Sequence, residues 1–186
     1  MNVRLTALLL VVLLIFGGTF LVVRFTKSEP NLPDRPWMYK VSDDDIIRIS
    51  VAFGGKTVSY NKKPGSEKWF IEGTPEVQVV QEKWSGTPLL LSGPQVSRVL
   101  ATTIDKPAAY GLDPPATKVV VQVRGGLSYE FHMGNPTPDG QNQYARLVGD
   151  PALFTVPEIW ARVINKLATD PPYPPVGDAT GAPGGG

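Results

Sequence analysis

The chain has a single histidine, His132, and its side chain is the strongest candidate for a catalytic group. It follows Glu130 by two residues. A histidine beside a carboxylate can act as a general base that the carboxylate orients. Strand alternation places both on one face with Ser128, opposite the apolar residues between them. Because the pattern aims no nucleophile at this pair, we predict that His132 is a solvent-facing strand residue and that the chain has no catalytic residue.

The run Asp43-Asp44-Asp45 is the other group that could hold a ligand, since hard cations bind clustered carboxylates. Consecutive residues of an extended chain point to opposite faces, and no calcium-loop spacing follows. We therefore predict a strand edge kept soluble by charge, and no metal site. The chain has no cysteine, and its glycine pairs lack phosphate-binding spacing. We expect no cofactor and no enzyme activity.

The most distinctive motifs are Tyr-Gly-Leu-Asp-Pro-Pro at 110–115, Gly-Asn-Pro at 134–136 and Gln-Tyr-Ala-Arg at 143–146. A glycine at 111 can adopt a conformation that a side chain forbids. Tyr144 and Arg146 share one strand face, where an aromatic ring and a guanidinium can contact each other or a partner. We take Tyr110, Asp113, Tyr144 and Arg146 as candidate partner or ligand contacts, with a purely structural role as the alternative.

Two stretches of alternating apolar residues predict hairpins. In the first, Ile47, Ile49, Val51 and Phe53 alternate with other residues ahead of a Gly-Gly turn, and Trp69 and Ile71 lie inward on a third strand. The second stretch, over 119–133, has the same plan around Gly125-Gly126. A strand-strand-strand-helix unit therefore occurs twice, which indicates an internal duplication.

Helices are expected at about 94–104 and from Pro157 onward. In the first, Val96, Val99, Leu100 and Ile104 recur at helical spacing. The closing helix is expected to bury apolar residues at 159, 160, 163, 164 and 167. Runs of strands followed by a helix predict an α+β fold: an antiparallel-sheet domain with two helices, after one N-terminal transmembrane helix.

That transmembrane helix is predicted over Leu5–Val23, 19 residues without a charge. As a helix it would be roughly 28 Å long, about the thickness of the hydrocarbon core of a bilayer. A cleaved signal peptide is the alternative, but its apolar region is usually shorter and ends in small residues. A raw count of flanking basic residues would keep the C-terminal side cytoplasmic. The short basic stub before the run is typical of a signal anchor, and we favour a domain outside the cytoplasm.

The chain is thus divided into an anchor (1–27), a Pro-rich spacer (28–37), an extracytoplasmic domain (38–169) and a disordered Pro/Gly-rich tail (170–186). Of the 18 lysines and arginines, three precede residue 28, so the remaining fifteen face 17 acidic residues. A slightly acidic domain binds polyanions poorly, and on this ground we expect no nucleic-acid partner.

The motifs at 110–115, 134–136 and 144–146, with a tryptophan-bearing early hairpin and a valine-rich strand, resemble the bacterial domain of unknown function family four-three-four-zero. The resemblance covers about residues 35–168. It implies an extracytoplasmic α+β domain behind an N-terminal membrane anchor, in a family some of whose members lie near auxiliary components of ABC-type transporters. It implies no activity and no catalytic residues.

The sequence therefore favours a non-enzymatic, single-pass accessory or structural subunit of a bacterial inner-membrane complex, whether of transport, respiration or photosynthesis. Its partners would be integral membrane subunits, with lipid around residues 5–23. The alternative is an extracytoplasmic binding module for a lipid, glycan or small ligand. It predicts an apolar pocket lined by some of Trp69, Trp84, Tyr110 and Tyr144. A hydrolase would need His132 or Asp43–Asp45 to converge with partners in a cleft.

Overall fold

The computed structural model describes residues 36–175. These residues all fall within the unit Asp34–Gly186. Within them, none of the helices combines the length and apolarity that a membrane crossing requires. The predicted anchor and most of the predicted spacer and tail lie outside the described residues.

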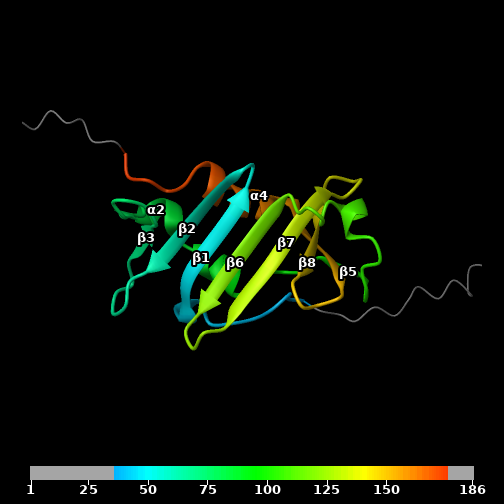
Figure 1. Ribbon diagram of the computed structural model, residues 1–186, viewed down its shortest axis with the longest axis horizontal. Coiled ribbons are helices and arrows are strands. Elements are labelled where there is room, and N and C mark those ends of the chain that lie inside the picture. The colour runs from blue at the N-terminus through cyan, green and yellow to red at the C-terminus, as the bar shows by residue number, and fades with distance from the viewer. Residues whose placement is uncertain (1–35, 176–186) are drawn as a thin grey trace, which may run out of the picture. The chain divides into compact units, whose positions relative to one another are not determined.

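One antiparallel sheet of nine strands organises the domain, as the alternating patterns predict. The strand order is β4-β3-β2-β1-β6-β7-β8-β9-β5, so the first strands of the two predicted repeats lie side by side at the centre (Figure 1). In chain order the strands are β1 (Ile46–Phe53), β2 (Lys56–Lys62), β3 (Trp69–Ile71), β4 (Val77–Gln78), β5 (Arg98–Ala101), β6 (Thr117–Val123), β7 (Ser128–Pro136), β8 (Asn142–Leu147) and β9 (Leu153–Pro157).

Two Gly-Gly turns close the central hairpins. Gly54 and Gly55 join β1 to β2 with φ of 59° and 75°, and Gly125 and Gly126 join β6 to β7 with φ of 86° and 85°. Two successive residues with positive φ match the twist of a tight hairpin, which explains the glycines. Both turns confirm the sequence prediction.

The helices lie on one side of the sheet, with α4 behind it in Figure 1. They are α2 (Gln81–Trp84), α3 (Thr87–Ser92) and α4 (Glu158–Thr169), and there are two 3-10 turns, η1 (Asp43–Asp45) and η2 (Pro107–Tyr110). We call the sheet face that packs against α4 the core face and the opposite one the outer face. The α+β architecture is confirmed.

The predicted helix at 94–104 is wrong. Residues 98–101 form β5, where Val99 pairs with Phe154 of β9, and the amide of Ser97 donates to the carbonyl of Thr155. The register shifts between Val99 and Ala101, so the apolar residues follow a broken strand alternation that resembles helical spacing. The helical turns of this half precede it, at α2 and α3.

Buried side chains tie α4 to the core face. The hydroxyl of Tyr60 donates to the carbonyl of Leu167, and Thr117 Oγ1 donates to Asn165 Oδ1 at 2.8 Å. Burial raises the pKa of Tyr60, with smaller contributions from neighbouring charges, so its phenol keeps the proton that it donates. These bonds fix the helix against β2 and β6.

Three expectations about exposure are corrected. A β-bulge between Ile46 and Arg48 buries Ile46 and leaves Ile47 exposed, against the predicted alternation. In α4, Ile159 and Val163 are exposed, because the helix turns Ala161, Ile164 and Asn165 toward the sheet instead. Asp43–Asp45 form the turn η1, not an extended edge.

The ends of the described segment also pack on the domain. The amide of Met38 donates to the carbonyl of Pro94, and the amide of Val96 donates to that of Pro36. At the other end, the amide of Val80 donates to the carbonyl of Pro172, which is buried. Hydrogen-bonded structure therefore extends into parts of the predicted spacer and tail.

Candidate functional site

The distinctive motifs meet at one junction. Gly111 follows η2 with φ of 68°, and a Cβ built there would stand 2.4 Å from Asn135 Oδ1. A Cβ on Gly134 would stand 2.1 Å from the carbonyl oxygen of Tyr110. Each glycine therefore allows the other motif's backbone to approach. The two motifs, which are more than twenty residues apart in sequence, form one tightly packed contact between η2 and β7.

The tyrosines join the third motif to this junction. The rings of Tyr110 and Tyr144 lie edge to face, with centroids 4.9 Å apart and planes at 62°. Ala145 is buried, so alternation along β8 places Tyr144 and Arg146 on the outer face, as predicted. The structure thus brings together Tyr110 and Tyr144, with Arg146 on the same face of the same strand. Among the described residues, exposed Asp113 makes no hydrogen bond or ion pair with them.

A polar row crosses three strands of the outer face beside the tyrosines. Arg146 Nε donates to His132 Nδ1 at 3.1 Å, and His132 Nε2 lies 2.8 Å from Glu130 Oε1. Glu130 Oε1 also lies 2.9 Å from Lys118 Nζ. The register explains the row, because Lys118, His132 and Arg146 are direct neighbours across β6, β7 and β8.

This row fixes the tautomer of the imidazole. Arginine can only donate, so the Nδ1 atom of His132 must carry a lone pair, and Nε2–H then donates to Glu130. Both ring nitrogens therefore have a hydrogen-bond partner within the row. His132 is only 8% exposed, against the predicted solvent-facing position, because the long side chains beside it cover the ring.

The charge of Glu130 depends on the row. Burial acts to raise its pKa, but the hydrogen bonds from Lys118 and His132 and the positive charge of Lys118 outweigh burial and hold the pKa below its ordinary value. The arrangement is that of an electrostatic link between strands.

Among residues 36–175, no group of three or more metal-binding side chains is assembled.

Glu130→Gln is expected to destabilise the domain at pH 7 by about 1 kcal/mol, since it removes a charge-assisted acceptor. A carboxyl group whose pKa is lower in the folded state stabilises the fold at pH values above its ordinary pKa of 4.5. This contribution is lost as the pH falls through the depressed pKa. The deficit of the variant should therefore shrink as the pH falls below 4.5 and through the depressed pKa. Urea unfolding between pH 3 and 7 measures it, with Glu82→Gln, at an exposed residue of α2, as the control. An equal deficit at all pH values would contradict this reading.

The four aromatic residues of the ligand-binding hypothesis do not line one pocket. Trp69 and Trp84 pack on each other with ring centroids 5.1 Å apart and border a cavity of about 250 Å³. Tyr110 and Tyr144 are not among the residues that line it. Sequence reasoning also missed a larger cavity, of about 630 Å³, where β1, β2 and β6 meet the β2–β3 turn. Its lining comes from strand ends that only the sheet order brings together.

The fold and the site define an α+β domain whose distinctive residues build a packed junction and a polar row. The chain belongs to the family described as Domain of unknown function (DUF4340), whose model matches residues 69–170. That match confirms the resemblance seen in the sequence. Neither the curated proteins nor the solved structures that were compared include a match to the chain.

Proposed function

We propose that this protein is a non-enzymatic accessory subunit of a bacterial membrane complex, and that its domain acts through protein–protein contacts. In this proposal Leu5–Val23 crosses the inner membrane once and the domain lies on the periplasmic or extracellular side. The uncharged apolar run and the proline-rich segment after it support the anchor. The structural support for the contacts is an exposed apolar surface on the helices.

This surface, here called the α3–α4 surface, consists of Leu89 and Leu90 of α3 and Ile159 and Val163 of α4. Leu89 is 65% exposed and Ile159 62%, while Leu90 and Val163 are 39% and 41% exposed. Trp160 Nε1 donates to the carbonyl of Leu90 at 3.4 Å, so α4 and α3 meet at this point. Four large exposed apolar side chains on two elements that meet favour an interaction site, whereas single scattered ones do not.

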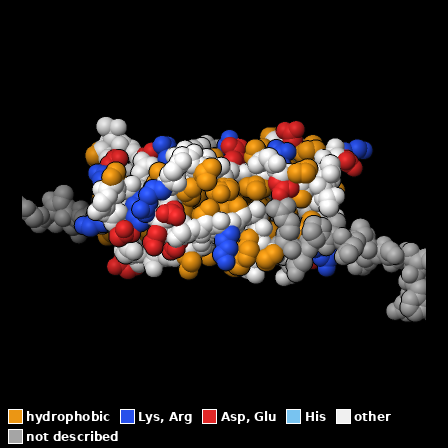
Figure 2. All heavy atoms as spheres, turned by 90° about the horizontal axis from the view of Figure 1, so that it is seen from below, with side chains coloured by type: hydrophobic (Ala, Val, Ile, Leu, Met, Phe, Trp, Pro, Cys, Tyr) orange, Lys and Arg blue, Asp and Glu red, His pale blue; other side chains and the backbone are white. Residues whose placement is uncertain are grey.

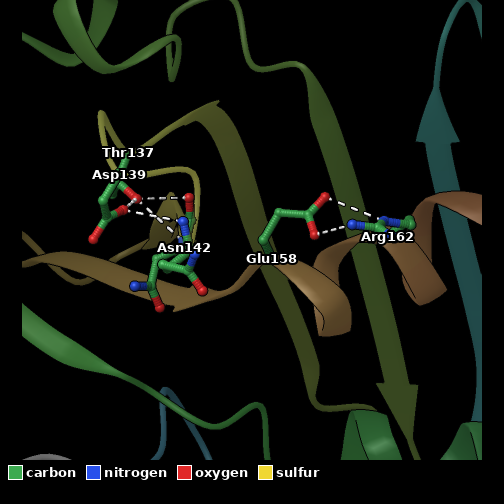
Figure 3. Close-up of polar contacts among 6 residues, drawn as sticks. Thr137, Asp139, Asn142, Glu158 and Arg162 are labelled. Carbon is green, nitrogen blue, oxygen red and sulfur yellow. Dashed lines mark hydrogen bonds and ion pairs between the residues drawn. The ribbon is translucent and has the colours of Figure 1, made fainter.

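Charged residues border the α3–α4 surface. On α4, Arg162 forms an ion pair with Glu158 one turn earlier, as Figure 3 shows. On the face of the molecule that Figure 2 shows, hydrophobic side chains gather between acidic and basic ones. An apolar centre with a polar rim is the usual anatomy of a protein interface. The α3–α4 surface is the observation that carries the proposal.

Ile159→Ser with Val163→Ser should release the protein from its complex without unfolding the domain. Both side chains are exposed, so their removal costs little in the folded monomer and much in a buried interface. The measurement is size-exclusion chromatography of the full chain, extracted from native membranes in mild detergent, with the co-purifying subunits identified.

Leu127→Ser is the matched control, because Leu127 is as exposed as Ile159 but lies in the β6–β7 turn. The control should retain the complex and the double variant should lose it. A wild-type chain that runs as a lone monomer at native expression levels would overturn the proposal.

A further inference from the structure

The 630 Å³ cavity lies on the outer face at one end of the sheet. Its floor is a row of three side chains on neighbouring strands, Asn61 of β2, Arg48 of β1 and Gln122 of β6, which the register places directly across from one another. The turn between β2 and β3, residues 63–67, forms one wall. All three floor residues carry hydrogen-bond donors.

The β-bulge of β1 shapes this cavity. Consecutive strand residues normally face opposite ways, yet both Ile47 and Arg48 line the cavity. The register shift between Ile46 and Arg48 accounts for this, since a bulge turns an extra side chain to the same side. Ile47 thereby adds an apolar patch next to the guanidinium.

The lining is strongly basic. It contains four basic side chains, Arg48, Lys62, Lys63 and Arg124, and one acidic side chain, Glu67. Three of the bases are held by acids that do not line the cavity: Arg48 by Glu72 at 2.8 Å, Lys63 by Glu76 at 3.0 Å and Arg124 by Asp45 at 3.7 Å. The acids orient these cations and offset part of their charge, while the lining itself contributes four basic side chains and one acidic one.

Arg48 is the best oriented of the four. Glu72 binds it through Oε2 and accepts from Asn61 Nδ2 through Oε1 at 2.6 Å, so one carboxylate fixes two residues of the floor. Only one guanidinium nitrogen is used in this bond, and the others remain as donors. Lys62 is 9% exposed and paired with Glu67, which puts a nearly buried charge beside the same cavity.

We propose that this cavity binds a phosphate group, either as a free phosphate compound or as the headgroup of an anionic lipid. Guanidinium, ammonium and amide donors converging on one volume match the oxygen atoms of a phosphate. The apolar side of Ile47 receives the carbon atoms attached to it. The cavity shares no lining residue with the α3–α4 surface.

The test uses the purified full chain in neutral maltoside detergent, titrated by calorimetry with inorganic pyrophosphate and with glycerophosphoglycerol, the deacylated headgroup of phosphatidylglycerol. Binding of one molecule per chain is expected for at least one probe, and the affinity should fall as salt is added. Arg48→Gln should weaken it about tenfold, as expected for loss of a charge-assisted contact. Arg124→Gln is a second variant, and because that side chain is 62% exposed we expect the variant to fold.

Arg98→Gln, at an exposed residue of the edge strand β5 and outside the cavity, is the control and should bind like the wild type. Binding of pyrophosphate would point to a free phosphate ligand, and binding of glycerophosphoglycerol alone to a lipid headgroup. Binding of neither probe, or an equal loss in Arg98→Gln, would overturn the proposal. Because the isolated chain is titrated, the result does not depend on whether a complex exists.

Discussion

Gly111→Ala is expected to destabilise the domain by about 2–4 kcal/mol, because two separate costs add. The first is a backbone with φ of 68°, which costs an alanine about 1 kcal/mol. The second is a collision, since the new Cβ would stand 2.4 Å from Asn135 Oδ1 and 2.9 Å from the backbone nitrogen of Asn135. The side chain can move, but the backbone of β7 cannot, and overpacking of this kind costs about 1–3 kcal/mol.

Gly140→Ala separates the two costs. Gly140 has φ of 69°, almost the same as Gly111, but nothing lies within 4 Å of a Cβ built there. Its alanine variant should lose only the backbone term, about 1 kcal/mol. Urea unfolding of both variants measures the difference. Equal losses would mean that the junction between η2 and β7 yields to the methyl group, and that the motifs are not packed as described.

Trp84→Ala should cost about 3–5 kcal/mol, the range for removing a large aromatic side chain from a core. Trp84 is 1% exposed, and its ring lies 4.6 Å from that of Tyr60 and 5.1 Å from that of Trp69. Without it, α2 has no other buried side chain to hold it on the sheet. The loss should appear as a lower midpoint of thermal or urea unfolding, together with lost protection of the α2 amides from hydrogen exchange.

Trp84→Phe is the informative companion. Trp84 Nε1 is buried and has no hydrogen-bond partner among the described residues, so the phenylalanine variant removes an unsatisfied donor as well as part of a ring. We expect its cost to be well below half that of Trp84→Ala. If the two variants were equally unstable, Nε1 would have a bonding role that the packing does not show.

Local patterns predicted the parts of the fold that depend on neighbouring residues. The Gly-Gly turns and the alternation of Val119, Val121 and Val123 specify hairpins, because turn geometry and pleat act over a few residues. The helix predicted at 94–104 failed because pairing with β9, more than fifty residues later, overrides local spacing. The predicted burial of Ile47 was wrong because no local sequence signal marks the β-bulge.

The site was predictable only in part. Tyr110, Tyr144 and Arg146 were singled out because their motifs are distinctive, and the predicted placement of Tyr144 and Arg146 on one strand face is confirmed; their role as contacts stays a prediction. The contact between Gly111 and Gly134 requires the sheet order, which no spacing reveals. The same holds for the basic cavity, whose floor joins strands far apart in the chain, and for the burial of His132 under its cross-strand neighbours.

The order of the strands has a consequence for how the chain folds during synthesis. The pair β1 and β6 lies at the centre of the sheet. One edge of β1 therefore has no partner strand until β6 has been synthesised, up to residue 123. β5 is made earlier than β6, yet it must be held aside until β9 supplies its neighbour at the far edge. Such distant pairings give a high contact order, for which slow folding is the rule. The nascent first half therefore exposes unpaired strand edges that are prone to aggregation. A chaperone that assists folding would bind during this interval.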